Sequence, residues 1–277
     1  RAYLTKPFEP EELLLHLREA DKLVRLRAQA GAGRGALLGA SEAMRRCYAE
    51  LDLAASSDAP ALISGETGTG KELFARAVHA NSRRAAASFV VVDCSALPAT
   101  LAESLLFGHE RGSFTGAEQS REGLVRQAHG GTLFLDEVGE ISPKMQVALL
   151  RVLEEKRFQR VGGNQHLTSD FRLISATNRD LPALIQQGGF RQDFFYRINV
   201  LSIAIPPLRE RVEDIIPLAE HFLAYFAAQT GKAQLVLEPT NFQMRVICKF
   251  YFQKYQQISK LLLFRYQLEL LRFLQIR

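Results

Sequence analysis

The sequence has few cysteines and no long apolar segment. Only three cysteines occur among 277 residues, and Cys47, Cys94 and Cys248 form neither a CxxC pair nor a cluster with histidine. No uninterrupted apolar run approaches the ~20 residues of a membrane-spanning helix. The first residues also lack the basic, apolar and small-residue zones of a signal peptide. We therefore expect a cytoplasmic protein with no disulfide framework, no zinc site and no membrane association.

The body of the chain has no excess of positive charge, although the formal net charge is +5. Residues 241–277 hold seven Lys or Arg and one Glu, whereas the other 240 residues hold 28 bases and 29 acids. The positive charge therefore belongs to the last 37 residues and does not indicate that the body binds nucleic acid.

This basic tail, residues 241–277, also lacks Gly, Pro and Asp and is rich in aromatic residues. Its leucines are partly at helical spacing, so an amphipathic helix that binds a membrane or a partner is one interpretation. A basic helix that contacts nucleic acid is another. The abrupt change in composition favours a third, a join produced by a frameshift or a misassembled reading frame. The intact mass of the native protein distinguishes the third interpretation from the others.

Five short apolar runs in the body alternate with helical patterns. Runs this short and this apolar are typical of parallel strands with helices on both faces, linked by right-handed crossovers. The sequence therefore predicts an α/β fold with a parallel five-stranded sheet. The expected strands are Ala61 to Ser64, Phe89 to Asp93, Thr132 to Asp136, Arg172 to Thr177 and Leu201 to Ile205.

A glycine-rich segment stands between the first expected strand and a helical pattern. Its glycines let backbone N–H groups turn toward phosphate oxygens, and Lys71 supplies a charge for the β- and γ-phosphates. Glu72 occupies the position where a Ser or Thr usually holds Mg²⁺, so the metal would depend on phosphates, water and a remote carboxylate. The pattern favours nucleotide binding over a plain strand-to-helix turn. This phosphate loop comprises Gly65, Glu66, Thr67, Gly68, Thr69, Gly70, Lys71 and Glu72.

Two adjacent acids, Asp136 and Glu137, end the third expected strand. Open α/β sheets bind their ligands at the carboxyl ends of the strands. There Asp136 can hold the Mg²⁺ shell, and Glu137 can polarise a water for attack on the γ-phosphate. Alone, the two acids could equally cap a helix. Together with the phosphate loop they favour hydrolysis over binding alone.

Three further polar residues could complete the site. Asn178, at the end of the fourth strand, could face the γ-phosphate, although Asn is also a common turn former. Arg191 and Arg197 stand six residues apart beside aromatic residues. An arginine supplied by a neighbouring subunit can accelerate phosphoryl transfer by about 10³ to 10⁵. The alternative is a surface ion pair with Asp193, and the residues alone leave both interpretations open.

A hexapeptide identifies a family that the chain resembles. Gly112, Ser113, Phe114, Thr115, Gly116 and Ala117 resemble the GAFTGA loop, with Ser113 in place of its first Ala. That loop marks the bacterial enhancer-binding proteins, the AAA+ ATPases that activate RNA polymerase carrying sigma-54. The likeness runs from about Leu37 to about Phe226 and includes a second loop at Val161-Gly162-Gly163 and the start of a helical lid at residues 206–211.

The resemblance implies an AAA+ P-loop NTPase fold with ATP and Mg²⁺ as cofactors. It makes Lys71 the phosphate lysine, Asp136 and Glu137 the metal-binding and water-activating acids, and Asn178 the γ-phosphate sensor. Arg191 and Arg197 match the trans-acting arginines, which implies a ring of subunits, for which the resemblance suggests a hexamer.

The resemblance also assigns three other positions. Leu38 and Gly39 resemble the segment that contacts adenine, and Glu72 is usual in the family. Asp93 stands where the family commonly has an Asn that links nucleotide state to the loops, so we expect that switch to work differently here.

The hexapeptide loop is the expected contact with the sigma factor. Gly112 and Gly116 flank Phe114 and Thr115, which gives a mobile tip with one aromatic ring and one hydroxyl. Without its flanking motifs the loop would more often be a buried hairpin tip. The resemblance implies instead that Phe114 and Thr115 contact sigma-54 when ATP is bound. The sequence predicts a β-hairpin beside this loop, at residues 158–171 with Gly162 to Asn164 at its turn.

We expect four parts along the chain. Residues 1–35 resemble the last strand and helix of a receiver domain followed by a linker, with an ordinary helix packed on the ATPase as the alternative. Residues 36–205 form the AAA+ core, 206–240 a partial lid and 241–277 the basic tail. After Pro239 we recognise neither the family's sensor arginine nor its helix-turn-helix, so we expect the family's DNA-binding domain to be absent from these residues.

The sequence therefore predicts an ATP-hydrolysing activator that remodels sigma-54 RNA polymerase at promoters through its GSFTGA loop. Two alternatives remain open at this point. One is a nucleotide-binding regulatory module that does not hydrolyse ATP, and the other is a different AAA+ remodelling ATPase, such as an unfoldase or helicase.

Overall fold

The computed structural model describes residues 37–98, 100–114 and 117–230. Contacts divide the chain into two units, residues 1–37 and 38–277, and nearly all described residues belong to the second unit. The predictions made for the receiver remnant, the basic tail and the end of the partial lid lie outside the described residues. So do Thr115 and Gly116 of the hexapeptide loop.

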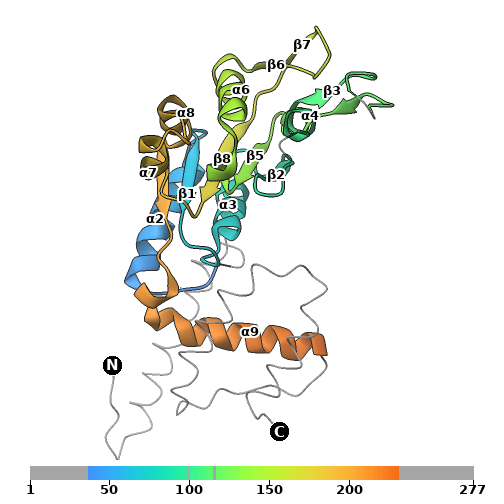
Figure 1. The fold of residues 1–277 in the computed structure, drawn as a ribbon. Helices are drawn as coiled ribbons and strands as arrows, with labels where there is room; N and C mark the ends of the chain where they lie inside the picture. The colour runs from blue at the N-terminus through green and yellow to red at the C-terminus, as the bar shows by residue number, and fades with distance from the viewer. Residues whose placement is uncertain (1–36, 99, 115–116, 231–277) are drawn as a thin grey trace, which may run out of the picture. The chain divides into compact units, whose positions relative to one another are not determined.

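The centre of the second unit is the parallel sheet that the sequence predicts (Figure 1). All four strand pairings in it are parallel, and the strand order is β2-β5-β8-β1-β9. The last strand ends at Ala204, one residue earlier than predicted, although the Ile205 N–H still donates to the Ser64 carbonyl at 2.8 Å. The strands are β1 (Ala61–Ser64), β2 (Phe89–Asp93), β5 (Thr132–Asp136), β8 (Arg172–Thr177) and β9 (Leu201–Ala204).

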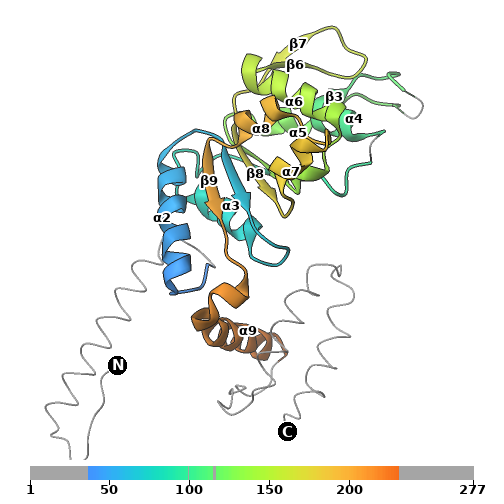
Figure 2. The same cartoon turned by 60° about the vertical axis from the view of Figure 1, so that its left-hand side comes forward.

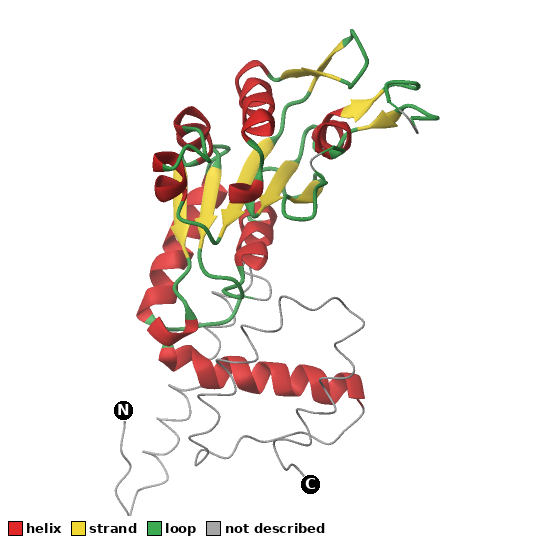
Figure 3. Ribbon diagram, in the orientation of Figure 1, coloured by secondary structure: helices red, strands yellow, loops and turns green. Residues whose placement is uncertain are grey.

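Helices cover both faces of this sheet (Figures 2 and 3). Because successive strand residues point to opposite faces, Leu133 and Leu135 of β5 join the buried cluster under one set of helices, while Phe134 stacks on Phe89 on the other face. The first set contains α4 (Ala102–Phe107), α5 (Leu124–Gln127), α6 (Pro143–Glu155), α7 (Leu181–Gln186) and α8 (Gln192–Ile198). The opposite face is covered by α2 (Glu42–Ser56) and α3 (Lys71–Ala80).

Two small antiparallel pairs project from the body. The pair β3 (Gly108–His109) and β4 (Arg121–Glu122) carries the hexapeptide loop, and β6 (Arg157–Gln159) and β7 (His166–Thr168) form the predicted hairpin. Backbone hydrogen bonds join the two pairs, because the Glu110 N–H donates to the Val161 carbonyl at 3.0 Å and the Val161 N–H donates to the Gly108 carbonyl at 2.9 Å. The hairpin therefore lies beside the loop, as predicted.

Three short helical turns complete the described part of the chain, and two of them connect the body to the last described helix. The turn η1 (Val138–Glu140) follows β5, and η2 (Leu208–Glu210) and η3 (Val212–Asp214) lead to α9 (Ile215–Thr230). Within the described ranges, no helix has the length and apolar character needed to cross a membrane.

Candidate nucleotide site

The phosphate loop is a tight turn between β1 and α3. Gly70 immediately precedes the helix with φ of +99°, in the left-handed region that glycine adopts without strain. The backbone N–H and the hydroxyl of Thr69 both donate to the Glu66 carbonyl, at 3.2 and 2.8 Å. The Gly65 N–H donates to the Thr177 carbonyl at 3.2 Å, so the loop is also attached to the end of β8.

Lys71 lies inside this turn and is only 6% exposed. Its ammonium donates to the carbonyls of Gly65 and Glu66, at 3.0 and 3.3 Å. The same Nζ lies 3.5 Å from Oε1 of Glu137. The lysine and the acid that the sequence places 66 positions apart therefore meet at the carboxyl edge of the sheet.

Glu137 is held in an unusual backbone conformation. Its φ of 51° and ψ of 51° lie in the left-handed region, which is uncommon for a residue other than glycine and often marks a functional position. Although Glu137 precedes the turn η1, its side chain makes no capping hydrogen bond there. Its Oε2 instead accepts from the Asn178 N–H at 3.1 Å. The capping alternative does not describe this side chain.

Asn178 joins β8 to the phosphate loop. Its side-chain amide donates to the Thr67 hydroxyl at 2.9 Å, while its backbone N–H contacts Glu137. The parallel register brings the ends of β1 and β8 together, with Ser64 opposite Thr177. The structure thus places three predicted elements of the site, the loop, the acids and the amide, in direct contact.

Asp136 and Asp93 end adjacent strands opposite each other in the register. Burial, followed by repulsion from Glu137, raises the pKa of Asp136. Asp93 is turned toward its own loop, where Oδ1 accepts from the N–H and the hydroxyl of Ser95 at 3.0 and 2.6 Å. Asp93 therefore contacts Ser95 rather than the phosphate loop.

The two acids after β5 fit a magnesium ion that is shared with phosphate. Mg²⁺ usually takes one or two protein carboxylates and completes its shell with phosphate oxygens and water. Asp136 and Glu137 provide such a set, and the part of the chain that the structure describes holds no cluster of three or more acids, histidines or cysteines able to bind a metal by itself. Glu72 is exposed and bonds Arg76 at 2.7 Å, so it does not join them.

The two predicted arginines are exposed. Arg197 lies within α8, and Arg191 immediately precedes this helix. Phe194 and Ile198 bury one side of this helix, which leaves Arg191 and Arg197 exposed. Arg191 forms a two-pronged ion pair with Asp193, at 3.0 and 2.6 Å. This is the local contact that the surface-pair interpretation expects. Arg197 donates to the Leu153 carbonyl at 2.9 Å.

Sequence reasoning missed two arginines that contact the phosphate loop. Arg209 pairs with Glu66 through two hydrogen bonds, at 2.8 and 2.6 Å, and these hold the pKa of Glu66 below its ordinary value. Buried Arg211 donates to the Thr69 carbonyl at 3.2 Å. Both belong to the stretch at residues 206–211, which the sequence marked as the start of a lid without giving either side chain a role.

The predicted adenine segment precedes α2. The Gly39 carbonyl accepts from the Tyr48 hydroxyl at 3.3 Å, and the next two backbone N–H groups donate to Asp214. Leu38 and Gly39 are partly buried. The segment therefore meets the same stretch, residues 209–214, that contacts the phosphate loop.

The described part of the hexapeptide loop presents a partly exposed ring. Phe114 is 37% exposed, and its ring meets that of His109 edge-on at 5.0 Å. The Gly112 N–H donates to the carbonyl of buried Ala117 at 2.8 Å, which closes the base of the loop. Ser113 packs against Gly162 of the neighbouring hairpin. Phe114 is thus not a fully buried hairpin tip.

Comparison with known proteins agrees with this arrangement. The sequence profile of the sigma-54 interaction domain matches residues 37–204. The chain belongs to this family. Its fold is that of the AAA+ P-loop NTPase domains of sigma-54-dependent enhancer-binding activators, as the sequence predicts. The family comprises ATPases that act on sigma-54.

Individual relatives of this family cover most of the chain. It is 52% identical over 235 residues to the transcriptional regulatory protein ZraR of Klebsiella oxytoca, covering 83% of this chain and 53% of ZraR. It is 47% identical over 246 residues to the regulatory protein AtoC of Escherichia coli, covering 86% and 53%. The crystal structure of NtrX from Brucella abortus in complex with ATP superposes with a TM-score of 0.71 at 35% identity, covering 88% and 53%. The chain thus spans about half the length of these relatives.

Proposed function

We propose that this chain hydrolyses ATP and uses the resulting movement of its GSFTGA loop to remodel sigma-54 RNA polymerase at promoters. The observation that carries the proposal is the position of Glu137, whose carboxylate lies between the ammonium of Lys71 and the backbone N–H of Asn178. A triphosphate in the loop would place its terminal phosphate beside these three groups. The function would place the protein in the cytoplasm, with the transcription machinery.

The phosphate loop would bind the β- and γ-phosphates. Its backbone N–H groups and the N-terminus of α3 favour anions, and Lys71 would exchange its contacts with the Gly65 and Glu66 carbonyls for phosphate oxygens. Asp136 would hold Mg²⁺, which supplies charge neutralisation and orientation of the phosphates. Glu66, Thr67, Gly68, Thr69 and Glu72 complete the loop.

Glu137 would act as the general base and Asn178 as the γ-phosphate sensor. A carboxylate oxygen of Glu137 would accept the proton of the attacking water, a role that contributes about 10² to 10⁴ in rate. The side-chain amide of Asn178, now bonded to Thr67, would turn to the γ-phosphate and so link nucleotide state to the end of β8.

The arginines of α8 would act on the site of a neighbouring subunit. Arg191 and Arg197 are exposed, as a trans-acting role requires, and each would stabilise γ-phosphate charge across the boundary. In this arrangement each subunit would take its arginines from its neighbour, so hydrolysis would need a closed ring, for which we propose a hexamer.

The GSFTGA loop would contact sigma-54. Phe114 and Thr115 would provide the apolar and hydroxyl contacts. The rest of this loop would be formed by Gly112, Ser113, Gly116 and Ala117. Because the loop is bonded to the β6–β7 hairpin through Val161, the two would move together. Capture of sigma-54 in the presence of a transition-state analogue, lost in Thr115→Ala, would distinguish this function from that of another AAA+ remodelling ATPase.

Steady-state phosphate release at increasing protein concentration tests the proposal. We expect a cooperative rise with concentration, because active sites form only between subunits. Glu137→Gln should keep ATP binding and lower turnover at least ~10²-fold, since the amide cannot accept the proton. Glu154→Gln, which changes an exposed acid of α6, is the matched control and should retain wild-type turnover. Wild-type turnover in Glu137→Gln would contradict the assigned role.

A nucleotide-binding module without hydrolysis is the second candidate, and one observation favours it. The guanidinium of Arg191 already pairs with Asp193, so this ion pair would have to break before Arg191 could act on a neighbouring subunit. ATP binding with no phosphate release at any protein concentration would support this candidate over the first.

A further inference from the structure

The segment before α2 is fixed by a carboxylate to which the proposed mechanism assigns no role. Asp214, at the end of η3, is 1% exposed. Its Oδ1 accepts from the backbone N–H groups of Ala40 and Ser41, at 2.7 and 3.0 Å, and its Oδ2 accepts from the Ser41 hydroxyl at 2.6 Å. Three hydrogen bonds satisfy one buried carboxylate, so the backbone at residues 40 and 41 is firmly anchored.

Gly39 allows the chain to approach this carboxylate closely. A β-carbon on Gly39 would lie 2.9 Å from Oδ2 of Asp214 and 3.1 Å from Cγ of Met44, and its φ of +140° is one that L side chains rarely adopt. The Tyr48 hydroxyl binds the carbonyl of the same glycine. The backbone of residues 39–41 is therefore held from both sides.

Arg211 connects this anchor to the phosphate loop. It is 5% exposed, and its two terminal nitrogens contact the Thr69 carbonyl at 3.2 Å and the Met44 sulfur at 2.9 Å. Burial lowers the pKa of its guanidinium, while the nearby charge of Asp214 acts in the opposite direction. Because Thr69 stands two residues before Lys71, the contacts of residues 211–214 set the distance between the segment at 39–41 and the phosphate loop.

We propose that Asp214 is a positioning residue for base recognition, which holds the backbone of residues 38–41 where it can hydrogen-bond the edge of adenine. The inference rests on the proposed function, which takes ATP as the ligand. A rigid backbone segment can separate adenine from guanine, because adenine presents a donor at the six-position where guanine presents an acceptor. Fixed polar groups that meet the wrong partner are left unpaired, which strongly disfavours the wrong base.

Calorimetric titration of the full chain with ATP, GTP and inorganic tripolyphosphate, each with Mg²⁺, tests this role. Tripolyphosphate reports the phosphate loop alone, because it carries no base. We expect Asp214→Ala to weaken ATP binding at least ~tenfold, to leave tripolyphosphate binding within about twofold, and to narrow the preference for ATP over GTP. Asp214→Asn retains one acceptor oxygen and should give a smaller loss.

The neighbouring acid provides a matched control. Glu213 is exposed on the same helical turn, and Glu213→Ala should leave all three affinities unchanged. A variant that only loses part of its folded population has all three apparent affinities reduced by the same factor. The ratio of ATP affinity to tripolyphosphate affinity therefore reports positioning separately from stability.

The outcomes separate the inference from the function on which it rests. If the wild-type chain prefers ATP and Asp214→Ala leaves the ATP-to-tripolyphosphate ratio unchanged, Asp214 does not position the base segment, and the proposed function stands. If the wild-type chain binds ATP no more tightly than tripolyphosphate, no base is recognised, and both the inference and the assignment of ATP are overturned.

Discussion

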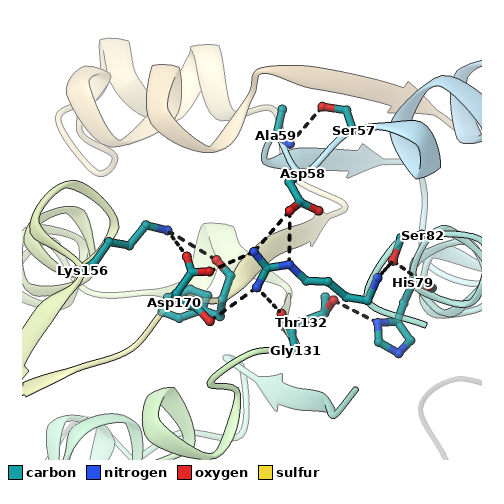
Figure 4. Close-up of polar contacts among 11 residues, drawn as sticks. Ser57, Asp58, Ala59, His79, Ser82, Gly131, Thr132, Lys156 and Asp170 are labelled. Atoms are coloured by element: carbon teal, nitrogen blue, oxygen red, sulfur yellow. Dashed lines mark hydrogen bonds and ion pairs between the residues drawn. The ribbon is translucent and has the colours of Figure 1, made fainter. Parts of the chain in front are cut away.

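The two ends of the central sheet both gather charged side chains, but they pair them differently. At the amino ends, Arg84 lies 3.2 Å from Asp58 and 3.0 Å from Asp170, and Lys156 lies 3.3 Å from the second oxygen of Asp170 (Figure 4). Asp58, Arg84 and Asp170 precede β1, β2 and β8. Bases and acids alternate among these four side chains, so each acid is paired and the cluster joins four connecting segments.

The carboxyl ends are less evenly matched. Asp136 and Glu137 are adjacent, and Lys71 is the ammonium beside them, 3.5 Å from Glu137. The other contacts of Lys71 are carbonyls of the phosphate loop. Burial and the charge of Glu137 raise the pKa of Asp136, which means that the fold disfavours its ionised form.

The difference between the two ends indicates where a ligand belongs. A cluster in which each acid is paired stabilises the fold, whereas two adjacent acids that share one ammonium at the end of a buried strand gain further counter-charge when a ligand binds. A magnesium nucleotide would supply that counter-charge to the acids and negative oxygens to the lysine. The distinction predicts that substitutions at the two ends affect different properties.

The largest effect should come from Lys71→Ala at the carboxyl end. This change removes the phosphate-binding charge, so we expect ATP affinity to fall by about tenfold to 10²-fold and phosphate release to become undetectable. Calorimetric titration and a phosphate-release assay measure both. Lys144→Ala is the control, because this lysine is 82% exposed and pairs with Glu103 on the surface. ATP binding unaffected by loss of Lys71 would contradict the site.

The opposite end should respond in stability instead. Arg84→Ala removes two ion pairs from a side chain that is 16% exposed, and we expect the free energy of unfolding to fall by about 2 kcal/mol. The folded fraction should bind ATP with wild-type affinity. Chemical denaturation measures the first effect, and Arg83→Ala, which changes the exposed neighbour, provides the control. A loss of ATP affinity without a loss of stability would show that the cluster acts on the site.

Local sequence pattern was sufficient for the sheet and the phosphate loop. Each strand of the sheet is a short apolar run that can be recognised without its partner strands, and the phosphate loop is one contiguous motif. The sequence therefore predicts all five strands of the sheet to within one residue. The contacts of Arg209 with Glu66 and of Asp214 with Ser41 were not found, because the partners stand 143 and 173 residues apart. Single polar residues in a turn carry no periodicity that would reveal such partners.

The two interpretations of Arg191 also show that a single sequence reveals local contacts more readily than contacts between subunits. Its pairing with Asp193 was foreseeable, because the acid is two residues away. Its proposed action in trans depends on a second subunit, and no pattern within one chain encodes the distance across that boundary. Likewise, the sequence marked Glu137 as an acid near a phosphate loop, but its left-handed backbone arises from the turn that follows β5.

The smallest predicted effect is on the free energy of unfolding, which Asp136→Asn and Asp170→Asn should change in opposite directions. Burial and Glu137 raise the pKa of Asp136, so its ionised form opposes folding at pH 7, and the neutral amide should slightly stabilise the ligand-free protein. Burial alone would raise the pKa of Asp170, but Arg84 and Lys156 together hold this pKa below the ordinary value. Its charge therefore supports folding at pH 7, and the amide should destabilise the protein, by less than about 1 kcal/mol at this exposed position.

Acidification should remove both effects, in a fixed order. As pH falls, Asp136 takes up its proton first, at its raised pKa, so the advantage of Asp136→Asn shrinks from there and is gone below the ordinary pKa of Asp. Asp170 loses its contribution only at lower pH, as its depressed pKa is passed, so the cost of Asp170→Asn persists longer. Thermal unfolding of both variants between pH 7 and the acid limit of folding measures the order. Equal signs at pH 7 would show that the two ends of the sheet do not differ in charge balance.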